Sequence, residues 1–170
     1  YGIDNGAELS MEIDPASFDE KDLYGYIDAG INRFSLGVQS FNNQILDKAG
    51  RRHKSIDAEN SCRWLNQAYE KNFIKSWSLD LIQNLPLGSF INWKSDLKKA
   101  LTFNPPHISI YDLSIEEGTV FKRLNDLGKL TLPDENVSFS NSQITHEILN
   151  KSGYLRYEIS NYSIPGHQSR

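Results

Sequence analysis

The chain has 170 residues, with a hydrophobic fraction of 38% and a charged fraction of 24%, which is ordinary for a folded domain with its own core. Its 22 acidic and 18 basic side chains give a net charge of −4, so no basic excess is available to neutralise nucleic-acid phosphates. Cys62 is the single cysteine, which excludes an internal disulfide, and no apolar run approaches the roughly 20 residues of a membrane span. We therefore expect a cytoplasmic protein that neither binds nucleic acid nor spans a membrane.

Short strand-like runs alternate with longer helix-like segments along the chain. Residues 9–13 indicate a strand, and residues 17–29 indicate a helix with Ser17 as its N-cap. Then follow a strand at 33–41, helices at 42–49 and 56–71, a strand at 75–82, a helix at 93–101, a strand at 107–113, helices at 119–127 and 134–151, and a last strand at 155–160. This alternation predicts parallel strands joined by right-handed crossovers, in either a barrel or a doubly wound sheet.

One face of the predicted sheet is unusually polar. Side chains alternate between the two faces of a strand, and the apolar faces have the covering helices as their destination. On the other face, four successive strands each place a polar residue near the C-terminal end: Glu12, Gln39, Asp80 and Tyr111. An unpaired buried polar group costs about 1–3 kcal/mol, so a polar lumen that opens at the C-terminal end of a barrel explains the pattern best.

The same carboxylates leave an unrelated hypothesis open. A glycosidase needs two carboxyl groups about 5–9.5 Å apart across a sugar, and Glu12 and Asp80 could form such a pair. Trp77 and Trp93 would be the sugar platforms, although Trp77 falls on the helix side of its strand.

Several sequence strings carry more information than the periodicity. They read GINRFSLGVQSF at 30–41, GRRH at 50–53, SLDLI at 78–82, PHISIY at 106–111 and YEISN at 157–161. In this order they resemble the radical S-adenosylmethionine proteins related to oxygen-independent coproporphyrinogen III oxidase. Three features resemble the HemW-type heme-chaperone branch: GRRH, YEISN and Ser40. At the position of Ser40 the oxidases tend to carry an acid. The resemblance implies an α/β fold: a partial TIM-like (β/α) barrel of the radical SAM type, with parallel strands and helices outside.

The resemblance also implies a function. It points to a chaperone that binds and transfers heme, with S-adenosylmethionine and a [4Fe-4S] cluster as cofactors of the full-length protein, and with heme or a porphyrin and a heme-accepting protein as partners. The alternative is the oxidase reaction, an oxidative decarboxylation of coproporphyrinogen III in heme biosynthesis. Residues 1–130 would form the barrel portion and residues 131–170 the start of a C-terminal region. The family's Cys-x3-Cys-x2-Cys cluster loop is not in the sequence, so we expect an inactive internal piece that binds neither cofactor tightly.

The matching motifs place S-adenosylmethionine-binding positions at Glu12, Gln39, Arg51, Asp80 and Asp112. Asp80 and Gln39 suit the ribose hydroxyls, Glu12 suits the ammonium, and Arg51 suits the carboxylate. Asp112 lies off the inward face, so we expect a backbone contact there.

Other expectations near the site are structural. Tyr111 is expected to line the site from its inward position alone, and no catalytic or metal-ligating residue is assigned. Cys62 is expected to be a small buried apolar residue. Gln83-Asn84 stands where the family usually has Tyr-Gly, and we expect a changed loop backbone because Asn tolerates positive φ less freely than Gly. The first strand is expected to expose an edge that promotes association.

Overall fold

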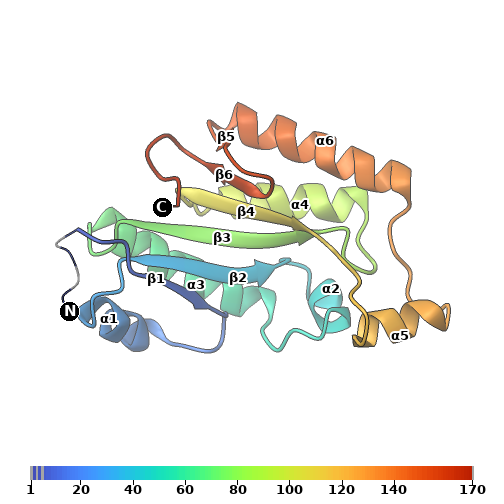
Figure 1. Ribbon diagram of the computed structural model, residues 1–170, viewed down its shortest axis with the longest axis horizontal. Coiled ribbons are helices and arrows are strands. Elements are labelled where there is room, and N and C mark those ends of the chain that lie inside the picture. Colours follow the sequence, from blue (N-terminus) through green and yellow to red (C-terminus); the bar gives the residue numbers. More distant parts are fainter. Residues whose placement is uncertain (1, 3, 5, 170) are drawn as a thin grey trace.

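The computed structural model describes residues 2, 4 and 6–169, and these form a single layer of sheet with helices packed on it (Figure 1). Six strands pair in the order β1-β2-β3-β4-β6-β5. Their bounds are β1 Ser10–Ile13, β2 Arg33–Gln39, β3 Ser76–Gln83, β4 His107–Asp112, β5 Leu155–Arg156 and β6 Asn161–Ser163. The strands β1 to β4 are parallel, as predicted, whereas β6 pairs antiparallel with β4, and β5 antiparallel with β6.

Six helices connect these strands among the described residues. Their bounds are α1 Glu20–Asp28, α2 Asn43–Lys48, α3 Ser55–Glu70, α4 Phe90–Leu101, α5 Val120–Asp126 and α6 Glu135–Lys151. Each lies within three residues of its predicted bounds, because short polar N-caps begin most of them: Asn42, Ser89, Thr119 and Asp134 each accept a backbone N–H. None of the helices in the described part of the chain has the length and apolar character needed to cross a bilayer.

The start of α1 differs from the prediction. Asp19, not Ser17, is the N-cap, and it forms a reciprocal capping box with Asp22. Ser17 instead donates its hydroxyl to the carbonyl of Asp14 over 2.6 Å. Phe18 is buried and meets Trp64 of α3 edge to face, so packing holds this residue outside the helix.

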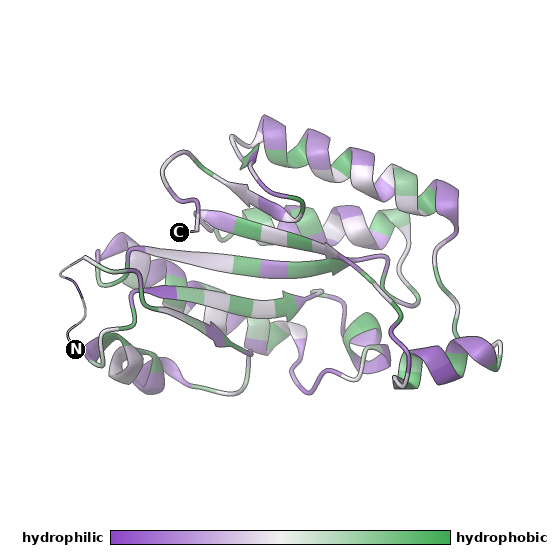
Figure 2. Cartoon of the chain, viewed as in Figure 1, coloured by the Kyte–Doolittle hydropathy of each residue, from purple (hydrophilic) through white to green (hydrophobic). Residues whose placement is uncertain are grey.

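The apolar core lies between the sheet and the helices behind it in Figure 1. Alternate residues of β2, β3 and β4 are fully buried there, and green and paler bands alternate along these strands in Figure 2. The helices α3 and α4 supply the facing apolar residues, among them Cys62, Leu65 and Leu97. Cys62 is buried, and burial raises the pKa of its thiol far above the ordinary range, which confirms it as a small core residue.

The opposite face of the sheet is polar along its whole length, but only part of it is open. Ser78, His107 and Ser109, towards the N-terminal ends of the strands, are buried and bonded to one another. Tyr111 and Glu12, nearer the C-terminal ends, are exposed. Hydrogen bonds therefore link the polar groups towards the N-terminal ends of the strands, and the face is exposed nearer the C-terminal ends.

The last predicted strand, at residues 155–160, is wrong in its extent. Only Leu155–Arg156 is extended, because the Arg156 guanidinium then donates to the carbonyls of Glu158 and Ile159 and closes a loop. The strand that joins the main sheet is β6, which pairs with the first half of β4. Helix α6 packs on α4, so the chain after residue 131 lies against the elements before it, and a domain boundary at 130/131 stays a prediction.

Candidate ligand-binding site

A cavity of about 530 Å³ opens where the parallel strands end on the polar face. Five of the six predicted site residues line it together: Glu12, Gln39, Arg51, Asp80 and Tyr111. The parallel register explains this convergence, because Glu12 pairs with Ser35 of β2, Gly37 pairs with Asp80 of β3, and Ile82 of β3 pairs with Tyr111 of β4. Its size lies within the range of about 300–1,000 Å³ that is usual for small-ligand sites.

Asp80 lies at the centre of the polar face and is held by two hydroxyl groups. Ser35 donates to its Oδ2 over 2.5 Å, and Ser78 donates to its Oδ1 over 2.8 Å. Burial raises the pKa of Asp80, while the hydroxyls of these serines and Ser109 oppose that rise. Because a carboxylate offers about four acceptor positions, each oxygen keeps room for one donor from a ligand.

A tight turn at the end of β2, the loop after α2 and the residue that follows β1 carry the remaining polar groups. Arg51 forms an ion pair with Asp14, which uses only part of its five N–H donors. Gln39 has a φ of 60°, and the ladder between β2 and β3 shifts its register there. A Cβ at Gly37 would come within 2.8 Å of Gln39 Nε2 and 2.9 Å of Asp14 Oδ1. Glycine at position 37 is therefore what lets these side chains share the cavity rim.

Two buried contacts hold this turn from behind. The His53 imidazole bonds through Nε2 to the carbonyl of Val38 over 3.1 Å, and burial lowers its pKa. Ser40 donates to Asp96 of α4 over 2.6 Å, and the backbone N–H of Phe41 donates to the same carboxyl group over 3.0 Å. His53 and Ser40 belong to the motif strings, and both anchor the backbone on either side of Gln39.

Asp112 does not join the cavity. Its carboxyl group accepts from Gln83 Nε2 over 3.1 Å and from Asn84 Nδ2 over 2.7 Å, beside a separate cavity of about 240 Å³. Asn84 has a φ of 63°, so asparagine adopts the left-handed conformation that glycine favours. The effect of Gln83-Asn84 on the loop backbone stays a prediction; in this chain both side chains contact Asp112.

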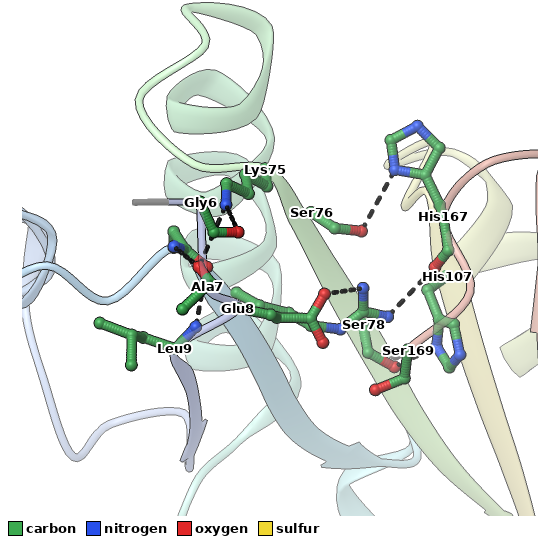
Figure 3. A network of polar contacts seen from close by, with 12 residues as sticks. Gly6, Ala7, Glu8, Leu9, Lys75, Ser76, Ser78, His107, His167 and Ser169 are labelled. Carbon is green, nitrogen blue, oxygen red and sulfur yellow. Dashed lines mark hydrogen bonds and ion pairs between the residues drawn. The ribbon is translucent and has the colours of Figure 1, made fainter. Parts of the chain in front are cut away.

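Residues that sequence reasoning had not assigned to the site extend it towards the N-terminal ends of the strands. A second cavity of about 290 Å³ shares Glu12, Ser35 and Tyr111 with the first and reaches His107 and Arg33. Figure 3 shows Ser78, His107 and Ser169 gathered beside one another, with His167 next to Ser76. Strand alternation placed the serines and His107 on the polar face, but nothing in the sequence showed which of them would pair.

The charge of the open cavity favours a cationic ligand. Three carboxylates, Glu12, Asp14 and Asp80, and one guanidinium, Arg51, line it, so negative charge is in excess. A ligand with a sulfonium, an ammonium and one carboxylate matches this set, and S-adenosylmethionine is such a ligand.

A [4Fe-4S] cluster, in contrast, does not fit the residues that the structure describes. Such clusters need thiolates, and Cys62 is buried in the core behind the sheet. Within residues 2, 4 and 6–169, no group of three or more His, Cys, Asp or Glu side chains could hold a metal ion.

Comparison with known proteins shows which proteins the whole chain resembles. Over 169 residues, the chain is 45% identical to a heme chaperone HemW of Synechocystis, covering 99% of this chain and 40% of the relative. It is 36% identical over 163 residues to a heme chaperone HemW of Lactococcus lactis, covering 96% and 42%. The chain is homologous to the radical S-adenosylmethionine proteins of the HemW type. It spans about 40% of the length of these relatives, and no family model matches it.

A solved structure supports the same relationship. The chain superimposes on coproporphyrinogen III oxidase (HemN) from Escherichia coli, described as a radical SAM enzyme, with a TM-score of 0.80 and 27% identity, covering 95% of this chain and 36% of that one. This confirms the partial barrel of the radical SAM type. Together with the HemW relatives, it favours the radical SAM interpretation over a carboxylate-pair hydrolase.

Proposed function

We propose that this chain forms the S-adenosylmethionine-binding wall of a protein that binds and transfers heme. The observation that carries the proposal is the convergence of Glu12, Gln39, Arg51 and Asp80 on one cavity with excess negative charge. These residues come from three strands and a loop, and a shared cavity is what a common ligand requires.

Each residue has a separate task towards the ligand. Asp80 accepts from the ribose hydroxyls with the lone pairs that Ser35 and Ser78 leave free. Gln39 lies beside it, and its Oε1 has no donor among the described residues. Glu12 pairs with the ammonium, and Arg51 turns part of its guanidinium from Asp14 to the ligand carboxylate. Tyr111 lines the cavity wall, whereas Asp112 lines the separate cavity, and its backbone contact with the ligand stays a prediction.

Heme handling is proposed from the relatives' names, together with the GRRH and YEISN strings. The whole protein would bind heme or a porphyrin and would pass heme to a heme-accepting protein. Its compartment would be the cytoplasm. The alternative is the oxidase reaction, in which S-adenosylmethionine bound beside a [4Fe-4S] cluster supplies a deoxyadenosyl radical. Identity favours the chaperone, at 45% against 27% for the oxidase structure.

Ligand-observed NMR with S-adenosylmethionine tests the site, because it detects the weak binding, about millimolar, that we expect of this chain. Asp80→Asn and Arg51→Ala should each weaken binding at least about fivefold, the loss expected when a charged hydrogen-bond partner is removed. Arg52→Ala is the matched control, since Arg52 is exposed in the same basic run and does not line the cavity. Equal affinity in all three variants would overturn the site assignment.

A heme titration followed by absorbance tests the function. Saturable heme binding with transfer to an apo-acceptor such as apomyoglobin supports the chaperone. Formation of protoporphyrinogen from coproporphyrinogen III, with no heme transfer, supports the oxidase instead.

A further inference from the structure

A chain of four hydrogen bonds connects the C-terminal segment to Asp80. The backbone N–H of Ser169 lies 3.1 Å from the Tyr157 hydroxyl, and that hydroxyl lies 2.7 Å from His107 Nε2. His107 Nδ1 lies 2.8 Å from Ser78 Oγ, which lies 2.8 Å from Asp80 Oδ1. The groups come from β3, β4 and the residues that flank β6, so only the folded sheet brings them together.

The number of donors and acceptors sets the direction of these four hydrogen bonds. An ionised Asp80 only accepts, so the single hydroxyl proton of Ser78 points to it. His107 Nδ1 must then carry the proton and donate to Ser78 Oγ, which leaves Nε2 of the neutral ring as an acceptor for Tyr157. The Tyr157 oxygen in turn accepts from the backbone N–H of Ser169. Ser109 Oγ lies 3.1 Å from Ser78 Oγ and can donate to the remaining lone pair of that oxygen. Every donor is then used, and no two donors face each other.

The opposite direction leaves a group without a partner. If His107 carried its proton on Nε2, it would donate to Tyr157, and Nδ1 would take the Ser78 hydroxyl away from Asp80. The Tyr157 hydroxyl proton would then have no acceptor among its contacts, because Ser169 also offers an N–H. Tyr157 is half-buried, and leaving its hydroxyl proton without a protein acceptor disfavours this arrangement relative to the first.

The surroundings of His107 keep its ring neutral. Burial, helped by Arg33 of β2 and by His167 of the C-terminal segment, lowers its pKa to about 4. The Arg33 guanidinium is itself fixed between Glu8 and the carbonyl of His167. A neutral ring donates from one nitrogen and accepts at the other, so its tautomer sets the direction of the hydrogen bonds on both of its sides. An imidazolium would donate from both nitrogens.

We propose that Tyr157 and His107 are positioning residues that set the His107 tautomer, hold the Ser78 hydroxyl on Asp80 and so keep this carboxylate ionised and oriented towards the cavity. The effect of this arrangement on S-adenosylmethionine binding rests on the proposed function, whereas the His107 tautomer and the ionisation of Asp80 do not. Tyr157 lies 77 residues beyond Asp80 in sequence, so the C-terminal segment takes part in tuning the site.

The first test needs no ligand. Long-range ¹H–¹⁵N NMR of the histidine rings in this chain should show His107 protonated on Nδ1 and bare on Nε2. Tyr157→Phe should shift the ring towards the Nε2 tautomer and raise the titration midpoint of Asp80, followed by carboxyl ¹³C shifts, by about one pH unit. Tyr154→Phe is the matched control: it also loses a short phenol bond, 2.6 Å to the Pro105 carbonyl, but lies outside the relay. A ring protonated on Nε2 in the unsubstituted chain, or equal shifts in both variants, would overturn the proposal.

A second variant separates positioning from folding. His107→Asn keeps an N–H near the Nδ1 position, so it should retain the Asp80 midpoint and make Tyr157→Phe silent in its background. Tyr157→Phe alone should weaken S-adenosylmethionine binding about fivefold, and the double variant should bind like His107→Asn. If the Asp80 midpoints follow this pattern but no variant binds S-adenosylmethionine, the relay, meaning the hydrogen-bond chain from Tyr157 to Asp80, stands and the proposed function fails. If Tyr157→Phe raises the midpoint equally in both backgrounds, the relay is refuted.

Discussion

Asp96→Asn should become steadily more favourable for stability as the pH rises, because it removes a buried carboxyl group that accepts from the motif residue Ser40. Asp96 is 5% exposed on α4 and accepts from Ser40 and from the backbone N–H of Phe41. Asparagine keeps the contact from Phe41 through its Oδ1, and its amide can donate to the Ser40 oxygen, but the Ser40 hydroxyl proton then loses its acceptor. The substitution therefore removes the cost of holding a buried charge and adds a cost, independent of pH, for the unpaired hydroxyl of Ser40.

The magnitude follows from the pKa. Burial raises the pKa of Asp96 from 3.8 to about 6, against the opposing hydrogen bonds. At 1.36 kcal/mol per unit this corresponds to about 3 kcal/mol. Because the folded pKa is raised, this contribution to stability is fully present below pH 3.8 and is lost as the pH rises through about 6.

The pH dependence of stability has to be measured in both Asp96→Asn and the unsubstituted chain, and the two curves subtracted. His107 titrates in the same window with the opposite sign: its pKa is lowered to about 4, so its contribution is present above pH 6.5 and lost as the pH falls through 4. The two effects partly cancel in the unsubstituted chain, whereas subtracting it from Asp96→Asn leaves the Asp96 contribution alone.

Urea unfolding followed by tryptophan fluorescence between pH 4 and 7.5 measures this difference. We expect the stability of Asp96→Asn relative to the unsubstituted chain to rise by about 2–3 kcal/mol between pH 4 and pH 7.5. The control Asp126→Asn, which removes an exposed partner of Lys122, should leave the stability nearly unchanged over this range. A difference independent of pH would refute the reasoning, because it would mean that the buried carboxyl group pays no ionisation cost.

Three further predictions concern the cavity rim, the core and the sheet edge. Gly37→Ala should weaken S-adenosylmethionine binding about fivefold by displacing Gln39 or Asp14, as calorimetry can measure. Gly25→Ala, with open space around it in α1, should instead raise the free energy of unfolding by about 0.5–1 kcal/mol, as urea melts can measure. Cys62 should not react with a thiol reagent at pH 8 until denaturant exposes it, since burial raises its pKa, and rapid labelling of the folded chain would contradict its core position. Light scattering should detect concentration-dependent association, because β1 pairs on one side only among the described residues; a monomer at all concentrations would argue against edge pairing.

The elements and the polar face were predictable because they depend on local periodicity. Glu12, Gln39 and Asp80 could be placed on one face from alternation alone, and parallel register then brings them to one cavity. Arg51 comes from a loop, where no period applies, and only its motif string indicated it. The start of α1 was misplaced because Ser17 and Asp19 are both suitable caps, and the burial of Phe18 decides between them.

The partners within the site were not predictable. Ser35 and Ser78 hold Asp80, but a serine on a polar face gives no sign of its partner until the register across strands is known. Tyr157 reaches His107 across 50 residues, through a hairpin whose second strand, β6, has only three residues. Three residues are too few to display a period of two, which is why an antiparallel strand escaped a prediction based on parallel crossovers.

The antiparallel pairing of β6 with β4 also has a consequence for how the protein is made. The free edge of β4 is complete at Asp112, but the strand that covers it ends at Ser163. At about 5–20 residues per second, a ribosome needs several seconds to add the intervening chain. Throughout that interval the nascent sheet presents the unpaired backbone of β4, so the synthesis of α5 and α6 is the period in which a chaperone at the ribosome has most to protect.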